Sequence, residues 1–220
     1  MKIIKYAQSC FLLNSKGINI LIDPSSYNET SVAENLKDIN IILISHKHAD
    51  HCDIPSIKTI IKNNPNIKIY SNSEVCSALK EERIKCNEVK VGDTIEEDGI
   101  KIEVVKAMHG YLPIMKGRFV KGNNGYIIDD KKIRVYHCSD TICFENDIKA
   151  DVVLVPICGH GVVMEPLVAV AFCQAINPKL VIPMHYDSEK HYMGTDRFEE
   201  EVKKTDLNYK ILKPSKSIEI

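Results

Sequence analysis

The pattern of hydrophobic and polar positions predicts short strands along the first third of the chain. Apolar or alternating runs predict strands at residues 3–6, 11–13, 18–22, 41–44 and 67–70. The polar turn at residues 14–17 joins two of these strands as a hairpin. The run 41–44 is entirely apolar, which is typical of a strand that is buried on both faces.

Helices are predicted between these strands. Residues 29–37 form a short helix candidate, and residues 73–82 form a longer one. Asp53 can cap a helix that has Pro55 in its first turn and that stops at Asn64-Pro65. Residues 84–105 are expected to be mostly strand, with a turn at residues 97–99.

The second half of the chain repeats this order of elements. A hairpin pattern at 126–136 matches that at 11–22, and residues 151–155, apolar from Val152 on, match 40–44. A helix beginning at Pro166 and a strand at 180–182 then match the helix at 54–63 and the strand at 67–70. The offsets are all about 111–115 positions, which indicates a duplication. We expect one domain, residues 1–220, with repeat halves of about 1–107 and 108–220.

A duplicated unit of this size predicts the fold. Half of the chain cannot bury both faces of its own sheet, whereas two halves can stack sheet on sheet with helices outside. The sequence therefore predicts an α/β fold, a four-layer αββα sandwich of two mixed β-sheets. The C-terminal ends of the strands of both halves should meet at one rim.

Composition narrows the classes of partner. The 220 residues suffice for one large domain with a sizeable core, and 44% hydrophobic with 27% charged residues is ordinary for a globular protein. A net charge of -1 gives no general attraction to nucleic acid or to an anionic membrane. We expect a small, anionic substrate, and we expect neither nucleic acid nor a membrane as a partner. It stays open whether the chain forms a homo-oligomer.

The cysteines bear on the cellular compartment. Eight are scattered along the chain without a C-x-x-C pair, and the N-terminus has the alternation of a strand and not the pattern of a signal peptide. We therefore expect reduced thiols and a cytoplasmic location.

The strand 41–44 leads directly into the pattern H-x-H-x-D-H. In an extended segment alternate side chains share a face, so His46 and His48 can converge on one cation. Asp50 and His51 follow where the chain must turn, and they can point at a second cation. Two metals about 3.5–4 Å apart could share a bridging water, as in two-metal hydrolases. The alternative is a polar loop with solvated histidines.

Further candidate ligands follow other predicted strands. His109 follows the strand 101–105, Asp140 follows 133–136, and His185 follows 180–182. Loops held by a rigid sheet are where catalytic groups usually lie. We expect these side chains to converge with the histidine motif.

Together these residues resemble the metallo-β-lactamase superfamily. Residues 21–24, 156–160 and 183–186 are similar to its ascorbate-6-phosphate lactonase-like branch. The resemblance implies the αββα fold and a zinc site with two ions. One ion would take His46, His48 and His109, the other would take Asp50, His51 and His185, and Asp140 would bridge them.

The sequence departs from the family pattern at two places. Ser139 stands where the family usually has glycine, and Pro166 is followed by apolar residues where that branch tends to have acidic ones. Neither departure touches a ligand, so they bear on substrate identity and not on the metal site.

The ligand chemistry suggests a mechanism. Imidazole and carboxylate suit Zn²⁺, and also Mn²⁺ or Fe. A metal-bridging hydroxide would attack a carbonyl or phosphoryl centre, while Asp50 orients it and carries a proton to the leaving group. Asp23 either holds the histidine loop from behind or forms an Asx turn before Pro24.

Several other residues have two interpretations. His160 either lines the substrate pocket or lies in an ordinary loop. Cys138 could ligate zinc, but both it and Cys52 are better explained as packed side chains. His191 is expected at the surface.

The segment 110–124 is the longest without a predicted element. It contains Lys116, Arg118 and Lys121 and no acidic residue, so it is either a flap that attracts an anionic substrate or a solvated loop.

The favoured function is a dinuclear metal-dependent hydrolase acting on a lactone, an ester or a small phosphorylated compound. One alternative is an RNA- or DNA-processing phosphodiesterase of the same fold, which the near-neutral charge and the lack of an inserted domain disfavour. The other is a non-catalytic metal-binding or redox-sensing protein. A flavodiiron oxygen reductase is disfavoured because His48 stands where that branch has glutamate.

Overall fold

The computed structural model describes residues 1–112, 119–188 and 193–220. The first sheet is built from β1 (Lys2–Lys5), β2 (Phe11–Ser15), β3 (Ile18–Ile22), β4 (Ile41–Ile44), β5 (Lys68–Ser71), β6 (Asn87–Glu88) and β13 (Lys216–Glu219). The second sheet is built from β7 (Thr94–Glu97), β8 (Ile100–Lys106), β9 (Asn124–Asp129), β10 (Arg134–His137), β11 (Val152–Pro156) and β12 (Leu180–Met184). The helices are α1 (Thr30–Asn35), α2 (Ile54–Asn63), α3 (Ser73–Glu81), α4 (Pro166–Ile176) and α5 (Asp196–Val202).

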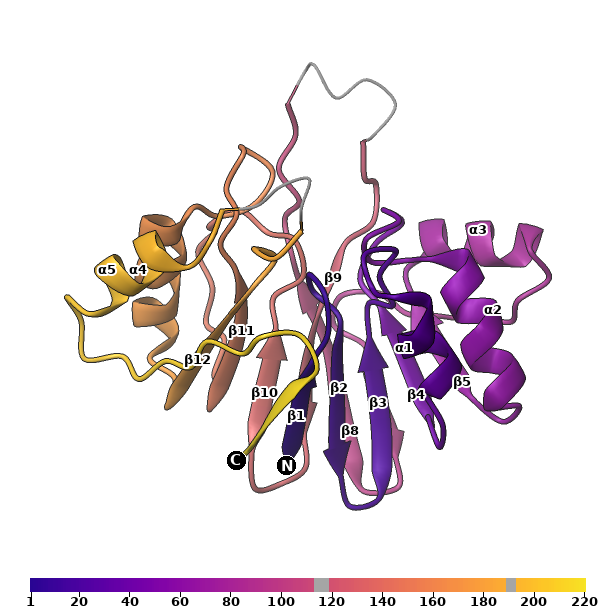
Figure 1. Ribbon diagram of the computed structural model, residues 1–220. Helices are drawn as coiled ribbons and strands as arrows, with labels where there is room; N and C mark the ends of the chain where they lie inside the picture. Colours follow the sequence, from indigo (N-terminus) through magenta and orange to yellow (C-terminus); the bar gives the residue numbers. More distant parts are fainter. Residues whose placement is uncertain (113–118, 189–192) are drawn as a thin grey trace.

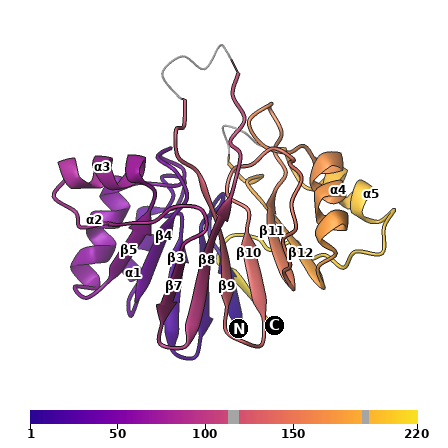
Figure 2. The same ribbon diagram turned by 180° about the vertical axis from the view of Figure 1, so that it is seen from behind.

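The two sheets form the middle of the molecule, and the helices lie on its two outer sides. Helices α1, α2 and α3 cover one side, and α4 and α5 cover the opposite side (Figure 1; Figure 2 shows the same arrangement from behind). Both sheets are mixed, with antiparallel hairpins followed by parallel strands. The predicted four-layer αββα sandwich is confirmed.

The strand orders of the two sheets correspond. The first runs β13-β1-β2-β3-β4-β5-β6, and the second, read from its other edge, runs β7-β8-β9-β10-β11-β12. In each sheet a hairpin (β2 with β3, β9 with β10) is followed by parallel strands, β4, β5 and β6 in the first sheet and β11 and β12 in the second. The chain passes to the second sheet at β7, and β13 returns to the first. The single domain and its division near residue 107 stay predictions.

Hydrophobic side chains from both sheets fill the space between them. The largest cluster joins Phe11, Ile20 and Leu43 of the first sheet with Tyr126 and Tyr136 of the second. A second cluster packs α1, α2 and α3 onto the outer face of the first sheet. All four side chains of β4 are 0–1% exposed, because one face meets each cluster. This double burial explains why β4 has no polar residue.

The predicted signals at the ends of α2 are confirmed. The side chain of Asp53 accepts a hydrogen bond from the backbone N–H of Ser56 at 3.1 Å, and Pro55 lies in the first turn. The helix ends before Asn64, where Pro65 prevents its continuation. The Asp53 cap also fixes where the histidine loop enters the helix.

Two C-terminal elements, α5 and β13, are not among the predicted ones. Helix α5 packs against α4, and β13 pairs with β1 in antiparallel register, so the two ends of the chain lie side by side (Figure 1). Their short and strongly polar sequences carry little hydrophobic periodicity. In the described ranges no helix is long and apolar enough to cross a membrane. The cytoplasmic location stays a prediction.

The prediction that all eight cysteines are reduced is wrong for one pair. Cys76 of α3 and Cys86 form a disulfide, with their Cα atoms 5.2 Å apart. The chain reverses after α3, where Arg83 has a positive φ of 60°, and this turn brings the two thiols together. A C-x-x-C pattern does not include a spacing of ten residues, so it gives no sign of this pair. The other six cysteines are free.

Candidate metal centre

The C-terminal ends of strands from both sheets meet at one rim and carry the candidate ligands. His46, His48, Asp50 and His51 follow β4 of the first sheet. His109, Asp140 and His185 follow β8, β10 and β12 of the second. Parallel strands of a sheet place such loops at the same edge, so the fold explains the convergence. The seven side chains form two adjacent groups, in each of which the ligand atoms lie within 4.8 Å of one another.

The first group, called the triad below, consists of His46, His48 and His109. Nε2 of His46 and Nδ1 of His48 are 3.1 Å apart, and the ring centroids of the three imidazoles are separated by 4.8–5.0 Å. Nitrogens about 2.0–2.1 Å from one tetrahedral ion would be about 3.3 Å apart. The triad therefore fits one cation.

The second group, called the tetrad below, consists of Asp50, His51, Asp140 and His185. Nε2 of His185 is 3.3 Å from Oδ2 of Asp50 and 3.2 Å from Oδ2 of Asp140. Nε2 of His51 is 3.3 Å from Oδ1 of Asp140. Oδ2 of Asp140 is also 3.7 Å from Nε2 of His109, so this carboxylate faces both groups.

Atoms without hydrogen bonds test whether the tetrad suits a metal. Within the described residues six buried side-chain nitrogen or oxygen atoms have no hydrogen-bond partner, and three of them belong to the tetrad: His51 Nε2, Asp140 Oδ1 and His185 Nε2. A buried polar atom without a partner costs about 1–3 kcal/mol, so such atoms are rare. A cation between them would be coordinated by all three. The tetrad fits a metal ion.

Electrostatics within the tetrad favour charged forms in spite of burial. Desolvation alone would raise the pKa of Asp140, but His185 and His51 hold it well below its usual value. Desolvation would lower the pKa values of His51 and His185, but the facing carboxylates, Asp140 foremost, raise both well above the usual range. In the triad burial and neighbouring imidazoles lower the pKa of His46. The carboxylates of the tetrad are thus ionised, and they favour positive charge beside them, either on the two imidazoles or on a bound cation.

Asp23 lies beneath the histidine loop and is fully buried. Its Oδ1 accepts a hydrogen bond from the Ser45 backbone N–H at 2.7 Å, and its Oδ2 accepts one from the Ser45 hydroxyl at 2.7 Å. Nδ1 of His51 also lies 2.7 Å from Oδ2. Because the Ser45 hydroxyl gives its proton to Asp23, its oxygen can accept from Nδ1 of His46, 3.0 Å away. One carboxylate thereby orients a histidine of each group.

The backbone at three of these strand ends is left-handed. Asp23, Ser139 and His185 have φ angles of 51°, 60° and 60°. Such angles are costly for residues other than glycine, and they persist where surrounding contacts enforce them. At Ser139 the hydroxyl donates to Oδ1 of Asn123 at 2.6 Å, and the Asn123 amide donates to the backbone carbonyl of Asp140 at 2.6 Å. These bonds explain how serine occupies this position next to a candidate ligand.

The other predicted site residues lie outside the two ligand groups. His160 is an exposed residue of the loop after β11, and this loop accepts a hydrogen bond from the Gly110 N–H through the Val162 carbonyl. The side chain of Lys121 is exposed, while its backbone N–H donates to Oε2 of Glu74 at 3.0 Å. Arg118, Lys116 and His191 lie outside the described residues, so the flap at 110–124 stays a prediction. The roles of His160, Lys121 and Arg118 in substrate binding stay predictions as well.

Cys138 and Cys52 are in neither ligand group. Both are buried and belong to the hydrophobic clusters of the core, as the packing interpretation predicts. Burial raises the pKa of both thiols, that of Cys52 to about 12, which disfavours the thiolate that a metal would need.

Contacts found only in the structure complete the site. His109 Nδ1 lies 2.7 Å from the Gly110 carbonyl, and His185 Nδ1 faces Cys158 Sγ at 3.1 Å and Gln8 Nε2 at 3.4 Å. Glu74 binds Lys47 of the histidine loop as well as the N–H groups of residues 121 and 122. Sequence gives no signal for Gln8 or Glu74, which lie far from the motifs along the chain. The position of Ser45 directly before His46 was the one available hint.

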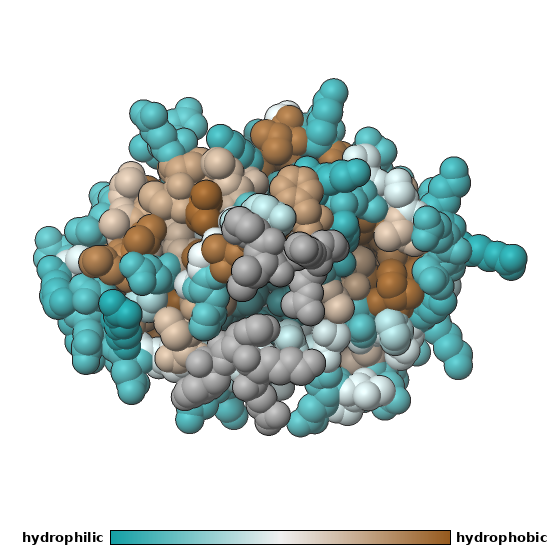
Figure 3. All heavy atoms as spheres, turned by 90° about the horizontal axis from the view of Figure 1, so that it is seen from above, coloured by the Kyte–Doolittle hydropathy of each residue, from teal (hydrophilic) through white to brown (hydrophobic). Residues whose placement is uncertain are grey.

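Hydrophobic side chains also reach this end of the molecule. Met108 and Tyr111, on either side of His109, are 36% and 49% exposed, and the rings of Tyr111 and Phe119 meet edge to face at 5.5 Å. The view onto the rim in Figure 3 shows hydrophobic patches surrounded by hydrophilic side chains. This end of the molecule therefore exposes both hydrophobic and hydrophilic side chains.

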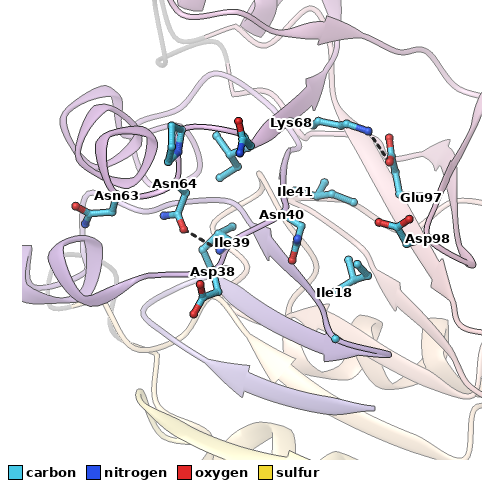
Figure 4. A pocket seen from close by; sticks show the side chains of 14 residues that line it. Ile18, Asp38, Ile39, Asn40, Ile41, Asn63, Asn64, Lys68, Glu97 and Asp98 are labelled. Carbon is cyan, nitrogen blue, oxygen red and sulfur yellow. Dashed lines mark hydrogen bonds and ion pairs between the residues drawn. The ribbon is translucent and has the colours of Figure 1, made fainter.

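A pocket of about 350 Å³ lies at the opposite end of the first sheet. Asn64, Asn40, Lys68 and Glu97 line it together with apolar residues (Figure 4). Asn64 accepts from the Ile39 N–H, and Lys68 pairs with Glu97 at 2.6 Å. Asn40 accepts a hydrogen bond from the Asn19 N–H, and no candidate metal ligands group at this pocket among the described residues.

Comparisons with known proteins agree with this geometry. Residues 2–185 match the beta-lactamase superfamily domain. The chain is 33% identical to a UPF0173 metal-dependent hydrolase of Thermoplasma acidophilum, over 86% of this chain and 84% of that protein. It is 32% identical to one of Methanocaldococcus jannaschii, over 83% of each chain. Igni18, a metallo hydrolase of Ignicoccus hospitalis, has a similar structure, with a TM-score of 0.82, 23% identity and coverage of 99% of this chain and 97% of that one.

Proposed function

Because the chain belongs to the beta-lactamase superfamily, and within it to the UPF0173 metal-dependent hydrolases, we propose that it hydrolyses a lactone, an ester or a small phosphorylated compound with two divalent metal ions. Membership confirms the expected superfamily and the expected class of enzyme, a metal-dependent hydrolase. The number of ions, zinc as the metal, and the lactonase-like branch belong to the proposal.

The observation that carries the proposal is the convergence of seven candidate ligand side chains at the rim. The triad offers three imidazoles, and the tetrad offers two carboxylates and two imidazoles with three atoms that lack hydrogen bonds among the described residues. Asp140 faces His51 and His185 of its own group and His109 of the other. This supports two ions with Asp140 between them. Imidazole and carboxylate ligands support Zn²⁺, with Mn²⁺ or Fe as alternatives.

The residues of the chain then have distinct tasks. When bound, the ions would lower the pKa of a water molecule and polarise the carbonyl or phosphoryl group of the substrate. The side chain of Asp50 is 19% exposed, against 0–6% for the other tetrad residues, so it is the carboxylate that substrate can reach. Its carboxylate can hold the proton of the attacking water and deliver it to the leaving group.

The substrate is proposed to be small and anionic. Lys47 and Lys121 lie close to the rim, and both are attached to Glu74, the first through its side chain and the second through its backbone. The side chain of Lys121 thus remains available to an anion, and we retain Arg118 and His160 as further candidates. Hydrophobic Met108 and Tyr111 beside His109 would suit an apolar group on the same substrate.

The test is turnover by protein reconstituted with Zn²⁺ or Mn²⁺ on three panels: lactones, carboxylic esters and phosphoesters. We expect hydrolysis in at least one panel, and at least about a thousand-fold loss of kcat/KM in Asp140→Ala. The matched control is Asp130→Ala, which removes another buried aspartate, located at the β9–β10 turn. Turnover in no panel by protein holding two ions would refute the proposal, as would full activity of Asp140→Ala.

A further inference from the structure

We propose that the thiol of Cys158 positions His185 for metal binding by accepting a hydrogen bond from its Nδ1–H. The inference rests on the metal centre proposed above, and it assigns a task to a residue outside the ligand set. Cys158 is 2% exposed and His185 is 5% exposed, so the contact is shielded from water.

The parallel pairing of β11 and β12 places the two residues side by side. Pro156 is in register with Met184, and the Ile157 N–H donates to the Met184 carbonyl at 3.2 Å. The next residue of each strand end, Cys158 and His185, then approach through their side chains, with Sγ 3.1 Å from Nδ1. The contact thus follows from the sheet and does not depend on a loose loop.

The direction of the hydrogen bond follows from the other face of the ring. Nε2 of His185 points between Asp50 and Asp140 and has no hydrogen-bond partner in the described part of the chain. If Nε2 presents its lone pair to a cation, the ring proton is on Nδ1 and needs an acceptor. The neighbours of Nδ1 are Cys158 Sγ and, at 3.4 Å, the Gln8 amide nitrogen. An amide nitrogen is only a donor, whereas the sulfur can accept.

The two histidines of the tetrad are therefore held by different chemistry. His51 Nδ1 lies 2.7 Å from a carboxylate oxygen of Asp23. His185 has the sulfur of Cys158 in the same place, and a cysteine sulfur is a weak acceptor. We infer that His185 is the less firmly oriented imidazole, and that loss of the sulfur weakens metal binding at the tetrad while the triad is unaffected.

The test compares Cys158→Ala and Cys158→Ser with wild type. Affinity for Zn²⁺ is measured by competition with a chromophoric chelator, and the histidine N–H protons are observed by proton NMR of the Co²⁺-loaded protein. We expect Cys158→Ala to bind one of two ions about ten-fold more weakly and to lose one slowly exchanging, paramagnetically shifted N–H signal. Cys158→Ser keeps a hydrogen-bond acceptor, so it should recover part of the metal affinity and part of the N–H signal.

Cys173→Ala is the matched control, because it also removes a buried thiol but lies in α4 away from the ligands. It should leave both affinities and all N–H signals unchanged. Unchanged affinity and N–H signals in Cys158→Ala would overturn the inference. The inference would also be overturned if Gln8→Ala showed these losses and Cys158→Ala showed none. In that case the Gln8 side-chain amide would have its oxygen turned towards the ring and would be the acceptor.

The inference and the proposed function fail in different ways. A dinuclear site is refuted by wild-type protein that binds fewer than two ions. The role of Cys158 is refuted by two ions bound equally tightly with and without the thiol. Wild-type protein that leaves the tetrad empty overturns both.

Discussion

The two ends of the sandwich differ in how their buried polar side chains are hydrogen-bonded. At the end shown in Figure 4, Asn64 accepts from the Ile39 N–H and donates to the carbonyls of Leu36 and Ile60. At the rim, His51, Asp140 and His185 each keep one buried atom without a hydrogen bond among the described residues. Because the side chain of Asn64 has hydrogen-bond partners, it stabilises the connections between elements at its end of the sandwich. The rim has buried atoms without such partners, so it is able to bind ions.

Removal of metal should give the largest effect. If each ion is present at about a hundred times its dissociation constant, it stabilises the fold by about 2.7 kcal/mol, and two ions would raise Tm by about 10–20 °C. Thermal unfolding with and without a chelator measures the shift. Asp140→Ala should lose at least half of it. If chelator leaves Tm unchanged, the rim is stabilised by protein contacts and not by bound metal. The two ends of the sandwich would then not differ in the way described above.

Asn64→Ala should act at the opposite end alone. It leaves a buried N–H and two carbonyls without their partner, which costs about 3 kcal/mol of unfolding free energy. Urea unfolding at equilibrium measures the loss, and metal content should stay at the wild-type value. Lys58→Ala, which removes an exposed ion pair with Glu82, provides a control with less than about 1 kcal/mol of effect. Loss of bound metal in Asn64→Ala would show that the ends are coupled.

Asp23→Asn should weaken metal binding by about 10–100-fold, equivalent to about 1.4–2.7 kcal/mol. The amide keeps the shape of the side chain but cannot replace a carboxylate that faces Ser45 and His51 together. Chelator competition measures the change. Unaltered affinity would mean that Asp23 serves only the turn before Pro24, the interpretation that the sequence left open.

Ser139 should give the smallest effect. Ser139→Ala removes the hydrogen bond to Asn123 and keeps the unfavourable φ of 60°, so we expect a loss of about 1 kcal/mol. Ser139→Gly loses the same bond but relieves the backbone, and the two terms should nearly cancel. Chemical unfolding of the two variants in parallel measures the difference. Equal losses in both would show that the backbone here is not strained.

The sequence predicted the fold where hydrophobic pattern and local signals agree. The apolar run of β4, the Asp53 cap with Pro55, and the repeated hairpins led to the αββα sandwich. It did not predict that β13 returns to β1 or that Cys76 meets Cys86, because both depend on contacts between segments with weak patterns. Long-range pairing of polar segments leaves no periodic trace in a single sequence.

The site shows the same division. The seven candidate ligands follow strand ends, so a strand prediction and the motif were enough to propose that they converge. The groups behind them were harder to find. Cys158 reaches His185 through the pairing of β11 with β12, and Gln8 reaches it from the other sheet, so neither contact is visible before the sheets are assembled.

The most direct test of the account is the metal content of the rim. Protein stripped with chelator and reconstituted with Zn²⁺ or Mn²⁺ is analysed by native mass spectrometry, beside Asp140→Ala and Asn64→Ala. The account predicts two ions per chain in wild type and in Asn64→Ala, and one or none in Asp140→Ala. One ion or none in wild type would contradict it.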